Sequence, residues 1–554
     1  MAARIDVDAV VVGAGHHGLV AAAILADAGW DVLVLEAQDE IGGAVRSTLL
    51  CPGFVADRFS SFHPLAVASP VLRALELQAH GLRWAHAPVV LAHPLGEHAA
   101  VLHRDPERTA AGLAAMHPRD GDTWLALVRR WERIEEPLLQ TLFAAFPPVR
   151  GPAGLLRRVG TPEALRIARF AALPATRMVR ELFDGEPARM LLLGNAAHGD
   201  APPVAPVSGA LGWLLAMLGQ RHGFPAPVGG AGRLAAALRR RAETAGAQIR
   251  TGERVERVVV RAGRAVGVRT ATGLTVRARR AVVADVSAPA LFGRLLPPDA
   301  VPARLRDDLR RFEWDGPTVK IDWALDGPIP WRSPGVAGAG TVHLCGGADG
   351  DDHRAGHSAD HSADHSAEHR LVRWSADLET GRLPREPFVL LGQMTTTDPG
   401  RSPAGTECAW AYSHLPPGRT GAADADELAR RIVATVEAHA PGFGDLIRHQ
   451  AVRGPAELEA ADANLVGGAV NGGTAQLHQQ LLFRPVPGLG RAETPVAHLF
   501  LASASAHPGG GVHGVCGQLA ARAALAEHGG LGAARRALRS AAMRHLFRDT
   551  PARP

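Results

Sequence analysis

Three glycines near the start of the chain have the spacing of a phosphate-binding turn. Gly13, Gly15 and Gly18 lie between an apolar run at 7–12 and an alanine-rich segment at 19–28. In a strand–turn–helix unit, the first glycine permits a tight turn, the second lets a pyrophosphate approach the backbone, and the third lets the helix pack on the strand. The helix N-terminus then faces the anion. The spacing therefore predicts a dinucleotide site.

An acidic residue follows at the end of the next expected strand, 32–35. Glu36 lies 18 residues after Gly18. A carboxylate at this position accepts hydrogen bonds from ribose hydroxyls and disfavours a 2′-phosphate. Strand, glycine turn, helix, strand and acid together predict a βαβ unit of about 30 residues.

A glycine pair comes shortly after this unit. Gly42 and Gly43 admit close backbone contact with a cofactor, and Arg46 offers a cation for a phosphate or a carboxylate. A plain Gly-Gly turn is the alternative interpretation.

Glycine-rich segments also occur in the middle and near the end of the chain. The middle one has Gly229 and Gly230 before an expected helix at 232–245, then Val255 and an apolar run at 282–285. The last one has an expected strand at 499–502, a turn, and an expected helix at 515–527. The positions of interest in this turn are Ser503, His507, Gly510, Gly511 and Val512. Glycine N–H groups and a helix N-terminus again suit a pyrophosphate or the carbonyl groups of a flavin.

These segments resemble the phytoene desaturase-like branch of the amine oxidase superfamily and its relatives with a pyridine nucleotide-disulfide oxidoreductase domain. The resemblance covers roughly 1–65, 206–330 and 495–530, and it implies FAD as the cofactor. It also implies that Val255 contacts adenine through its backbone and that the 510–512 turn lies beside the flavin. Many carotenoid desaturases carry arginine directly after the glycine pair, whereas Ala44 stands here, so at this position the chain resembles the desaturase-like relatives more than the carotenoid enzymes, and the resemblance does not identify the substrate.

Segments with short apolar strands and glycine turns alternate along the chain with segments of a different pattern. This alternation predicts an α/β fold with a discontinuous Rossmann-like FAD-binding domain and an interleaved α+β substrate domain. We expect the FAD-binding domain at 1–75, 225–298 and 490–530. The substrate domain is expected at 76–224, mainly long amphipathic helices, and at 299–489. A low-complexity His-rich loop is predicted at 353–369 and a C-terminal helix or tail at 531–554. The repeat of His-Ser-Ala-Asp units is typical of an exposed loop, although histidines four apart on a helix are a metal-binding alternative.

Lys320 is the single lysine, against 59 arginines, in a strand-like stretch at 317–325. In monoamine oxidase relatives a lysine in a comparable strand holds a water beside flavin N5, so Lys320 is a candidate catalytic residue. A sheet-edge lysine paired with Asp322 or Glu313 is the alternative.

His507 is the second candidate catalytic residue, as an acid or base or as a hydrogen-bond partner of the cofactor. His513 is a weaker candidate, and Asp57 is expected at the flavin edge or in the substrate domain. Cys516 is expected to pack as a small side chain rather than to attach the flavin. The four cysteines are scattered, so no metal site is predicted.

The amino-acid composition limits the kinds of partner that this chain is expected to bind. The net charge is +5 over 554 residues, with the arginines spread along helical faces, so no nucleic-acid partner is predicted. No apolar run reaches the length of a transmembrane helix, and cytoplasm is the expected location. The expected ligand is a small hydrophobic substrate, with peripheral membrane contact left open.

The favoured function is hydride transfer from an apolar substrate C–H to flavin N5. Two alternatives stay open: a flavin amine or amino-acid oxidase that uses Lys320, and a non-catalytic interaction protein stabilised by FAD. No second glycine fingerprint occurs, so reoxidation by oxygen or a quinone is expected rather than by NAD(P).

Overall fold

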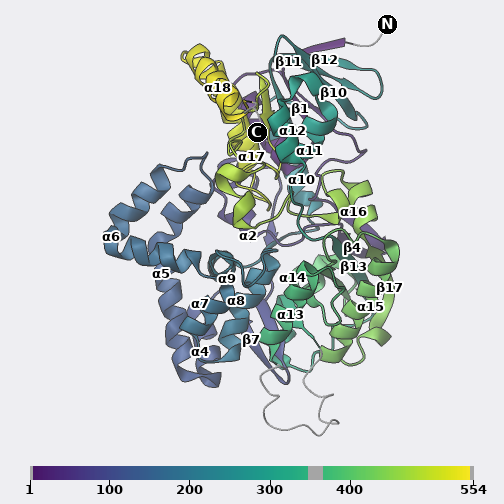
Figure 1. Cartoon of the computed structure of the whole chain (residues 1–554). Coiled ribbons are helices and arrows are strands. Elements are labelled where there is room, and N and C mark those ends of the chain that lie inside the picture. Colours follow the sequence, from purple (N-terminus) through teal and green to yellow (C-terminus); the bar gives the residue numbers. More distant parts are fainter. Residues whose placement is uncertain (1–3, 347–365, 549–554) are drawn as a thin grey trace.

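A mainly parallel sheet forms the upper part of the molecule in Figure 1, a computed structural model that describes residues 4–346 and 366–548. Its order is β10-β11-β12-β1-β2-β9, and β18 pairs with β12. The parallel strands are β1 (Arg4–Val12), β2 (Val32–Leu35), β9 (Gln248–Arg250), β12 (Thr275–Ala284) and β18 (Leu499–Leu501). The hairpin β10 (Val255–Arg261) and β11 (Arg264–Thr270) extends it. The apolar run expected at 282–285 is the end of a longer strand, because β12 begins at Thr275 and pairs with β1 along nearly its whole length.

Both faces of this sheet are buried, as the continuous apolar strands predict. On β1, Ala9 and Val11 pack with α1 (His16–Asp27), α10 (Gly232–Thr244) and α17 (Val515–Glu527), whereas Val10 and Val12 face the opposite layer. That layer contains α11 (Ala288–Ala290), α12 (Ala303–Leu309) and side chains of α18 (Gly532–Leu546). The two-residue alternation of a strand thus supplies two separate cores.

A second sheet lies below the first, with the order β17-β13-β16-β15-β14-β6-β7. Its strands are β6 (Val89–Leu95), β7 (His98–Leu102), β13 (Thr318–Leu325), β14 (Ala339–Cys345), β15 (Phe388–Gln393), β16 (Glu407–His414) and β17 (Ile447–Arg453). The expectation that 76–224 is mainly helical is therefore incomplete. Strands β6 and β7 come from that segment, because β6 pairs in parallel with β14.

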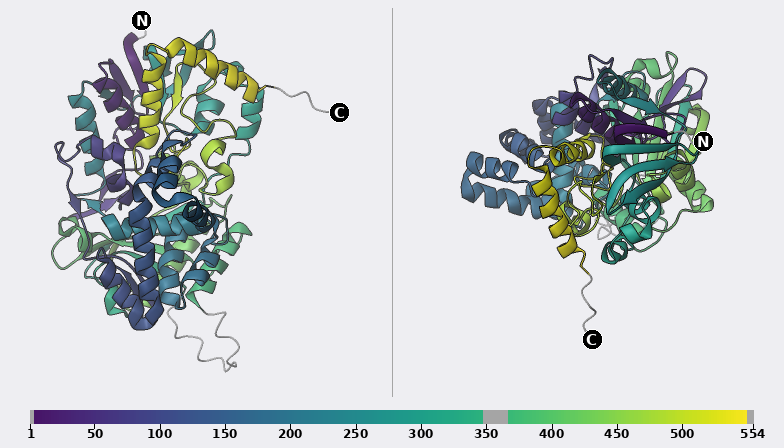
Figure 2. Two further views of the ribbon diagram at one scale, coloured as in Figure 1. Left: turned by 90° about the vertical axis from the view of Figure 1, so that its left-hand side faces the viewer. Right: turned by 90° about the horizontal axis from the view of Figure 1, so that it is seen from above.

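Helix α15 (Ala422–His439) packs on one face of the second sheet, and a bundle of helices packs on the other. The bundle comprises α4 (Pro106–Met116), α5 (Pro118–Leu142), α6 (Arg150–Ala172), α7 (Ala175–Leu182), α8 (Glu186–His198) and α9 (Ser208–His222). Seen from above, the blue helices of residues 118–172 stand out at the left of the molecule (Figure 2).

Short elements join the two halves of the molecule. They are β3 (Ser47–Cys51), β4 (Phe54–Asp57), α2 (Pro64–Ala68), α3 (Pro70–Ala74), β5 (Trp84–Ala85), β8 (Ala226–Pro227), α14 (Met394–Thr397) and α16 (Pro455–Ala461). The boundaries expected for the two domains stay a prediction.

Most of the predicted His-rich loop lies outside the described residues. Its last part does not fit the expectation of a loop up to residue 369. Helix α13 (Ala367–Glu379) begins there, and the Ser366 hydroxyl accepts a hydrogen bond from the backbone N–H of His369 as its N-cap.

Candidate active site

The turn between β1 and α1 requires each of its three glycines. Gly13 has a φ of +98°, in the region that favours glycine. A Cβ on Gly15 would lie 2.6 Å from Oδ2 of Asp285, and a Cβ on Gly18 would lie 2.2 Å from the carbonyl oxygen of Gly13. The backbone is therefore packed as a phosphate-binding turn requires.

Glu36 is held at this turn from two sides. Its Oε2 accepts a hydrogen bond from Ala14 N–H (2.7 Å), and its Oε1 accepts one from Gln38 N–H (2.9 Å). Burial raises the pKa of Glu36, and these two hydrogen bonds partly offset that effect. The backbone N–H of Glu253 donates to the Glu36 carbonyl (2.8 Å), so the segment that leads into Val255 runs beside Glu36. The structure thus brings these two predicted site residues together.

The glycine pair packs directly against the first turn. Gly42 N–H donates to the Ala14 carbonyl (2.8 Å), and a Cβ on Gly43 would lie 3.3 Å from Cα of Gly15. Arg46 donates to the carbonyl oxygens of Gly43 (2.9 Å) and Ala461 (2.5 Å). These hydrogen bonds of its guanidinium thus go to backbone carbonyls, and a role toward a cofactor phosphate stays a prediction.

The C-terminal glycine turn closes on the same region. A Cβ on Gly517 would lie 2.0 Å from the carbonyl oxygen of His17, so α17 meets the start of α1 at backbone distance. A Cβ on Gly510 would lie 2.7 Å from the Asn471 carbonyl, and one on Gly511 would lie 2.7 Å from Cδ1 of Leu65. Val512 is 9% exposed.

Ser503 is buried just before this turn. Its hydroxyl accepts a hydrogen bond from Ser505 N–H (3.3 Å). The side chain therefore stabilises the local turn, and its predicted role in cofactor binding is not tested by this contact.

The first glycine turn, the Gly42–Gly43 pair and the C-terminal turn therefore meet at backbone distance, and side chains at these positions would collide with neighbouring atoms of the chain. A flat dinucleotide cofactor needs this kind of close backbone approach, together with a free helix N-terminus for its pyrophosphate. The residues present fit FAD in this respect.

A cluster of carboxylates borders the first turn. Asp285 Oδ2 accepts a hydrogen bond from Gly18 N–H (2.8 Å). Burial, with the nearby Asp462 and Glu36 carboxylates, raises the pKa of Asp285 to about 8 despite that hydrogen bond. Asp285 is thus held largely neutral at pH 7.

Lys320 is buried in the middle of the second sheet rather than at its edge, because β13 lies between β17 and β16. Its Nζ donates to the Asp57 carbonyl (2.8 Å) and forms an ion pair with Asp322, which also pairs with Arg453. Burial lowers the pKa of Lys320, and Asp322 offsets this only in part. The pairing with Asp322 is the structural alternative considered for this lysine, and its catalytic role stays a prediction.

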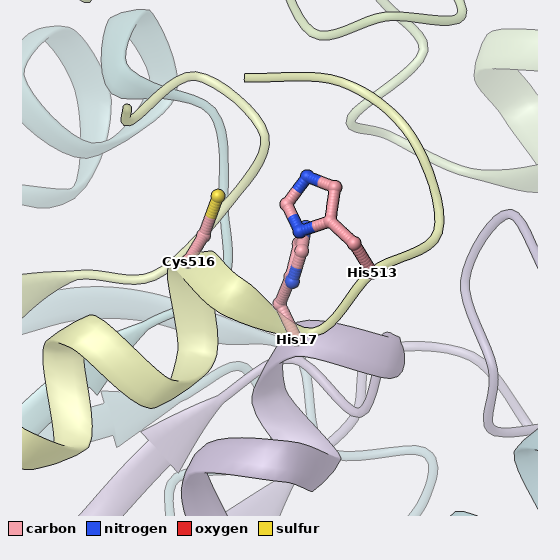
Figure 3. Close-up of side chains that lie close together, drawn as sticks. All are labelled: His17, His513 and Cys516. Carbon is pink, nitrogen blue, oxygen red and sulfur yellow. The ribbon is translucent and has the colours of Figure 1, made fainter. Parts of the chain in front are cut away.

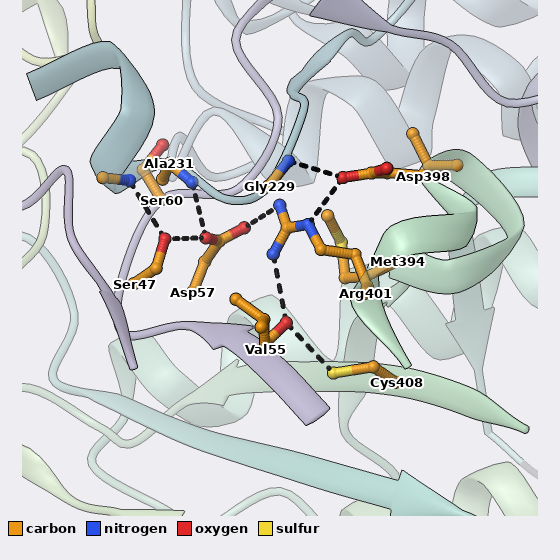
Figure 4. A network of polar contacts seen from close by, with 12 residues as sticks. Ser47, Val55, Asp57, Ser60, Gly229, Ala231, Met394, Asp398, Arg401 and Cys408 are labelled. Atoms are coloured by element: carbon orange, nitrogen blue, oxygen red, sulfur yellow. Dashed lines mark hydrogen bonds and ion pairs between the residues drawn. The ribbon is translucent and has the colours of Figure 1, made fainter. Parts of the chain in front are cut away.

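Asp57 lies at the centre of a buried network that joins the two halves of the molecule (Figure 4). Its Oδ1 accepts hydrogen bonds from the Ser47 hydroxyl (2.8 Å) and Ala231 N–H (2.7 Å). Its Oδ2 accepts from Arg401 (2.8 Å), and Arg401 also donates to Asp398 (3.2 Å). The two carboxylates outweigh the effect of burial and raise the pKa of Arg401.

The sequence did not single out Arg401 or Asp398. Asp398 also accepts a hydrogen bond from Gly229 N–H (2.8 Å), so the network positions the middle glycine segment. Arg401 is separated from Asp57 by 344 residues and is one arginine among many. The turn-like Asp398-Pro399-Gly400 was the only local signal.

His507 and Cys516 lie close to the C-terminal turn. Nε2–H of His507 donates to the Ala144 carbonyl (3.0 Å), its Nδ1 has no hydrogen-bond partner among the described residues, and burial lowers its pKa. Cys516 is 1% exposed in α17, and burial raises the pKa of its thiol to about 12. This burial agrees with the expected packing role of Cys516.

Fold and site define a flavoprotein oxidoreductase with a dinucleotide-binding sheet and a second sheet covered by helices. Residues 18–372 match the model of the flavin containing amine oxidoreductase family, and the chain belongs to that family. It is an enzyme, an FAD-dependent oxidoreductase, as the resemblance implied.

The chain is similar to several known proteins. It is 28% identical to mouse "Pyridine nucleotide-disulfide oxidoreductase domain-containing protein 2" over 93% of each chain. It is 31% identical to hydroxyneurosporene desaturase of Cereibacter sphaeroides, over 53% of this chain and 59% of that protein. A solved putrescine oxidase double mutant has the same fold, with a TM-score of 0.58 at 17% identity, covering 94% of this chain and 99% of the other. No described helix has the length and apolar character needed to cross a membrane.

Proposed function

We propose that this enzyme removes a hydride from an apolar C–H of a small hydrophobic substrate, as a desaturase does. Bound FAD accepts the hydride. The relative that is named a hydroxyneurosporene desaturase supports desaturation as the reaction, and the solved amine oxidase supports the fold alone.

The observation that carries this proposal is the apolar packing between the second sheet and the helix bundle. His93 and His343 on the sheet and His198 at the end of α8 lie in this interior, and burial lowers the pKa of His93 to about 3, lowers that of His198 to about 4 and lowers that of His343 strongly. The Phe388 ring lies 5.4 Å from the His343 ring and the Phe224 ring 6.5 Å from the His198 ring, between centroids. Mainly apolar and aromatic surroundings suit a hydrophobic substrate.

Desaturation also releases a proton from the neighbouring carbon, and His507 is our candidate to accept it. Its Nε2 carries the hydrogen donated to Ala144, so the lone pair is on the unpartnered Nδ1. His507 Nδ1 would take the proton as the C=C bond forms, and FAD, when bound, would supply the hydride acceptor, so that the two electrons of the C–H bond are accounted for.

Amine oxidation is the second candidate. Trp410 and Tyr412 stack with centroids 5.9 Å apart and an interplanar angle of 15°, and Lys320 Nζ lies 5.8 Å from the Trp410 ring centroid. This arrangement resembles part of an aromatic cage. Against it, the Lys320 amine is already engaged by Asp322 and Asp57 and has less freedom to hold a water.

Anaerobic reduction of the purified holoenzyme separates the two candidates. We expect polyene and terpenoid hydrocarbons to bleach the flavin absorbance, primary amines to leave it unchanged, and His507→Gln to slow the bleaching by at least about tenfold, or about 1.4 kcal/mol in the barrier. Bleaching by amines alone would overturn the proposal in favour of amine oxidation.

A further inference from the structure

His17, His513 and Cys516 form a buried cluster where the first and last glycine turns meet. One ligand atom from each residue lies within 4.8 Å of the other two. Figure 3 shows the three side chains directed into the same space, His17 from the start of α1, and His513 and Cys516 from the turn and first residues of α17. Their exposed fractions are 1%, 2% and 1%.

The hydrogen bonding of this cluster is incomplete. Neither ring nitrogen of His17 makes a hydrogen bond of normal geometry within the described part of the chain. Two buried ring nitrogens without a hydrogen bond lower the stability of the fold, because each loses its hydration on burial and gains no partner. The thiol of Cys516 makes only long contacts, 3.7 Å to the Ala506 carbonyl and 3.8 Å to the Gly509 carbonyl.

The two imidazoles of this cluster suit metal binding by their chemistry. A neutral imidazole has one ring nitrogen with a free lone pair, and this is the form of histidine that binds a metal.

We propose that His17, His513 and Cys516 bind a zinc ion that links the N-termini of α1 and α17. Two imidazole nitrogens and one thiolate are a ligand set that zinc takes in tetrahedral sites. The Gly509 carbonyl oxygen lies 3.2 Å from Nε2 of His513 and 3.8 Å from Sγ of Cys516, so an oxygen ligand is at hand for the fourth position. The Zn–S bond replaces the S–H bond of Cys516, and the proton leaves to solvent. The ring nitrogen of His513 that binds zinc loses its present hydrogen bond and gains a bond to the metal.

Zinc would connect the two glycine turns that come from opposite ends of the chain. The proposed substrate interior lies elsewhere, between the second sheet and the helix bundle, so the zinc proposal does not depend on the reaction proposed above. The surrounding carboxylate, Asp285, hydrogen-bonds to Gly18 and is not among the three ligands.

The test is metal analysis of the FAD-loaded full chain, purified after growth with added zinc and dialysed against metal-free buffer. We expect one zinc per chain, and X-ray absorption at the zinc edge should show a single sulfur at about 2.3 Å with nitrogen ligands at about 2.0 Å. Cys516→Ala and His17→Asn should each lower the zinc content per chain at least tenfold, with the flavin content of each variant measured alongside. Cys345→Ala, which removes another buried cysteine, should keep the wild-type zinc content.

Wild-type protein that holds no zinc after this treatment overturns the proposal, as does bound zinc without a sulfur ligand. Because the absorption spectrum is measured on the wild type, the proposal is decided even when a variant does not fold.

Discussion

At the scale of single residues, Glu36 joins two turns through its two carboxylate oxygens. Replacing it by arginine removes the acceptors for Ala14 N–H and Gln38 N–H and places a long cation in a buried position. We expect Glu36→Arg to be purified without flavin, and Glu36→Gln, which keeps one acceptor, to retain part of it. The ratio of flavin absorbance to protein absorbance measures this, and a yellow Glu36→Arg protein would contradict the assignment of Glu36 to the FAD site.

Two roles are considered for Lys320, one in an ion pair and one in catalysis, and a substitution distinguishes them. In Lys320→Met, Asp322 keeps Arg453 as a partner, so we expect a folded protein with a lower Tm. If the lysine acts mainly through its ion pair, the rate of flavin reoxidation by oxygen stays within about twofold of the wild type. A fall of about tenfold or more, equal to about 1.4 kcal/mol, would restore the catalytic hypothesis. Stopped-flow absorbance with Tm as the companion measurement distinguishes the two.

Asp285 makes stability depend on pH. Its pKa is raised to about 8 by burial and by Asp462 and Glu36, so at pH 7 the folded protein binds a proton that the unfolded chain has released. This stabilisation is fully present below the unfolded pKa of about 3.9 and is lost as pH rises through about 8. We expect the Tm of Asp285→Asn minus that of the wild type to increase from pH 5 to pH 9. A difference that is flat with pH would mean that Asp285 is ionised in the folded protein.

At the scale of elements, Arg401 holds β4, the middle glycine segment and the turn after α14 together. Arg401→Met leaves two buried carboxylates, Asp57 and Asp398, without their cation. We expect a loss of about 3–5 kcal/mol in the free energy of unfolding, from denaturant titration. Arg261→Met, at an exposed position of β10, is the matched control and should change it by less than about 0.5 kcal/mol. Equal effects in the two variants would show that the network is not energetically important.

How far the sequence predicts these elements depends on whether the signal is local. The helix at 515–527 and the strand at 32–35 are confirmed at the expected residues, because glycines bound them and apolar periodicity fills them. The length of β12 and the position of β13 inside its sheet were not predictable, since both depend on which strand pairs alongside. For the same reason Gly13, Glu36 and Gly42 were predictable as neighbours, because they belong to one contiguous motif, whereas the contact of Asp57 with Arg401 was not.

At the scale of the whole molecule, deletions in the His-rich segment test whether this segment contributes to the stability of the fold. We expect deletion of 357–364 to leave Tm and flavin content nearly unchanged, because removing a few residues from the connection between β14 and α13 changes its closure entropy little. Deletion of 357–369 should lower Tm, because it removes the Ser366 N-cap of α13, worth about 1 kcal/mol, and the ion pair between Glu368 and Arg180. Differential scanning calorimetry compares the two. A large loss of stability in the shorter deletion would show that the repeat itself supports the fold.

Strand β18 pairs with β12 through residues that lie 217 positions apart, Ala284 and Leu501. During translation at about 5–20 residues per second, the C-terminal half of β12 therefore waits roughly 10–40 s for its last neighbour. Throughout that interval an apolar strand edge at Val282 and Val283 is open to other nascent chains. We therefore expect this chain to be open to aggregation at this edge while it is being synthesised, and a chaperone that covers the edge until Leu499 emerges to raise the yield of folded protein.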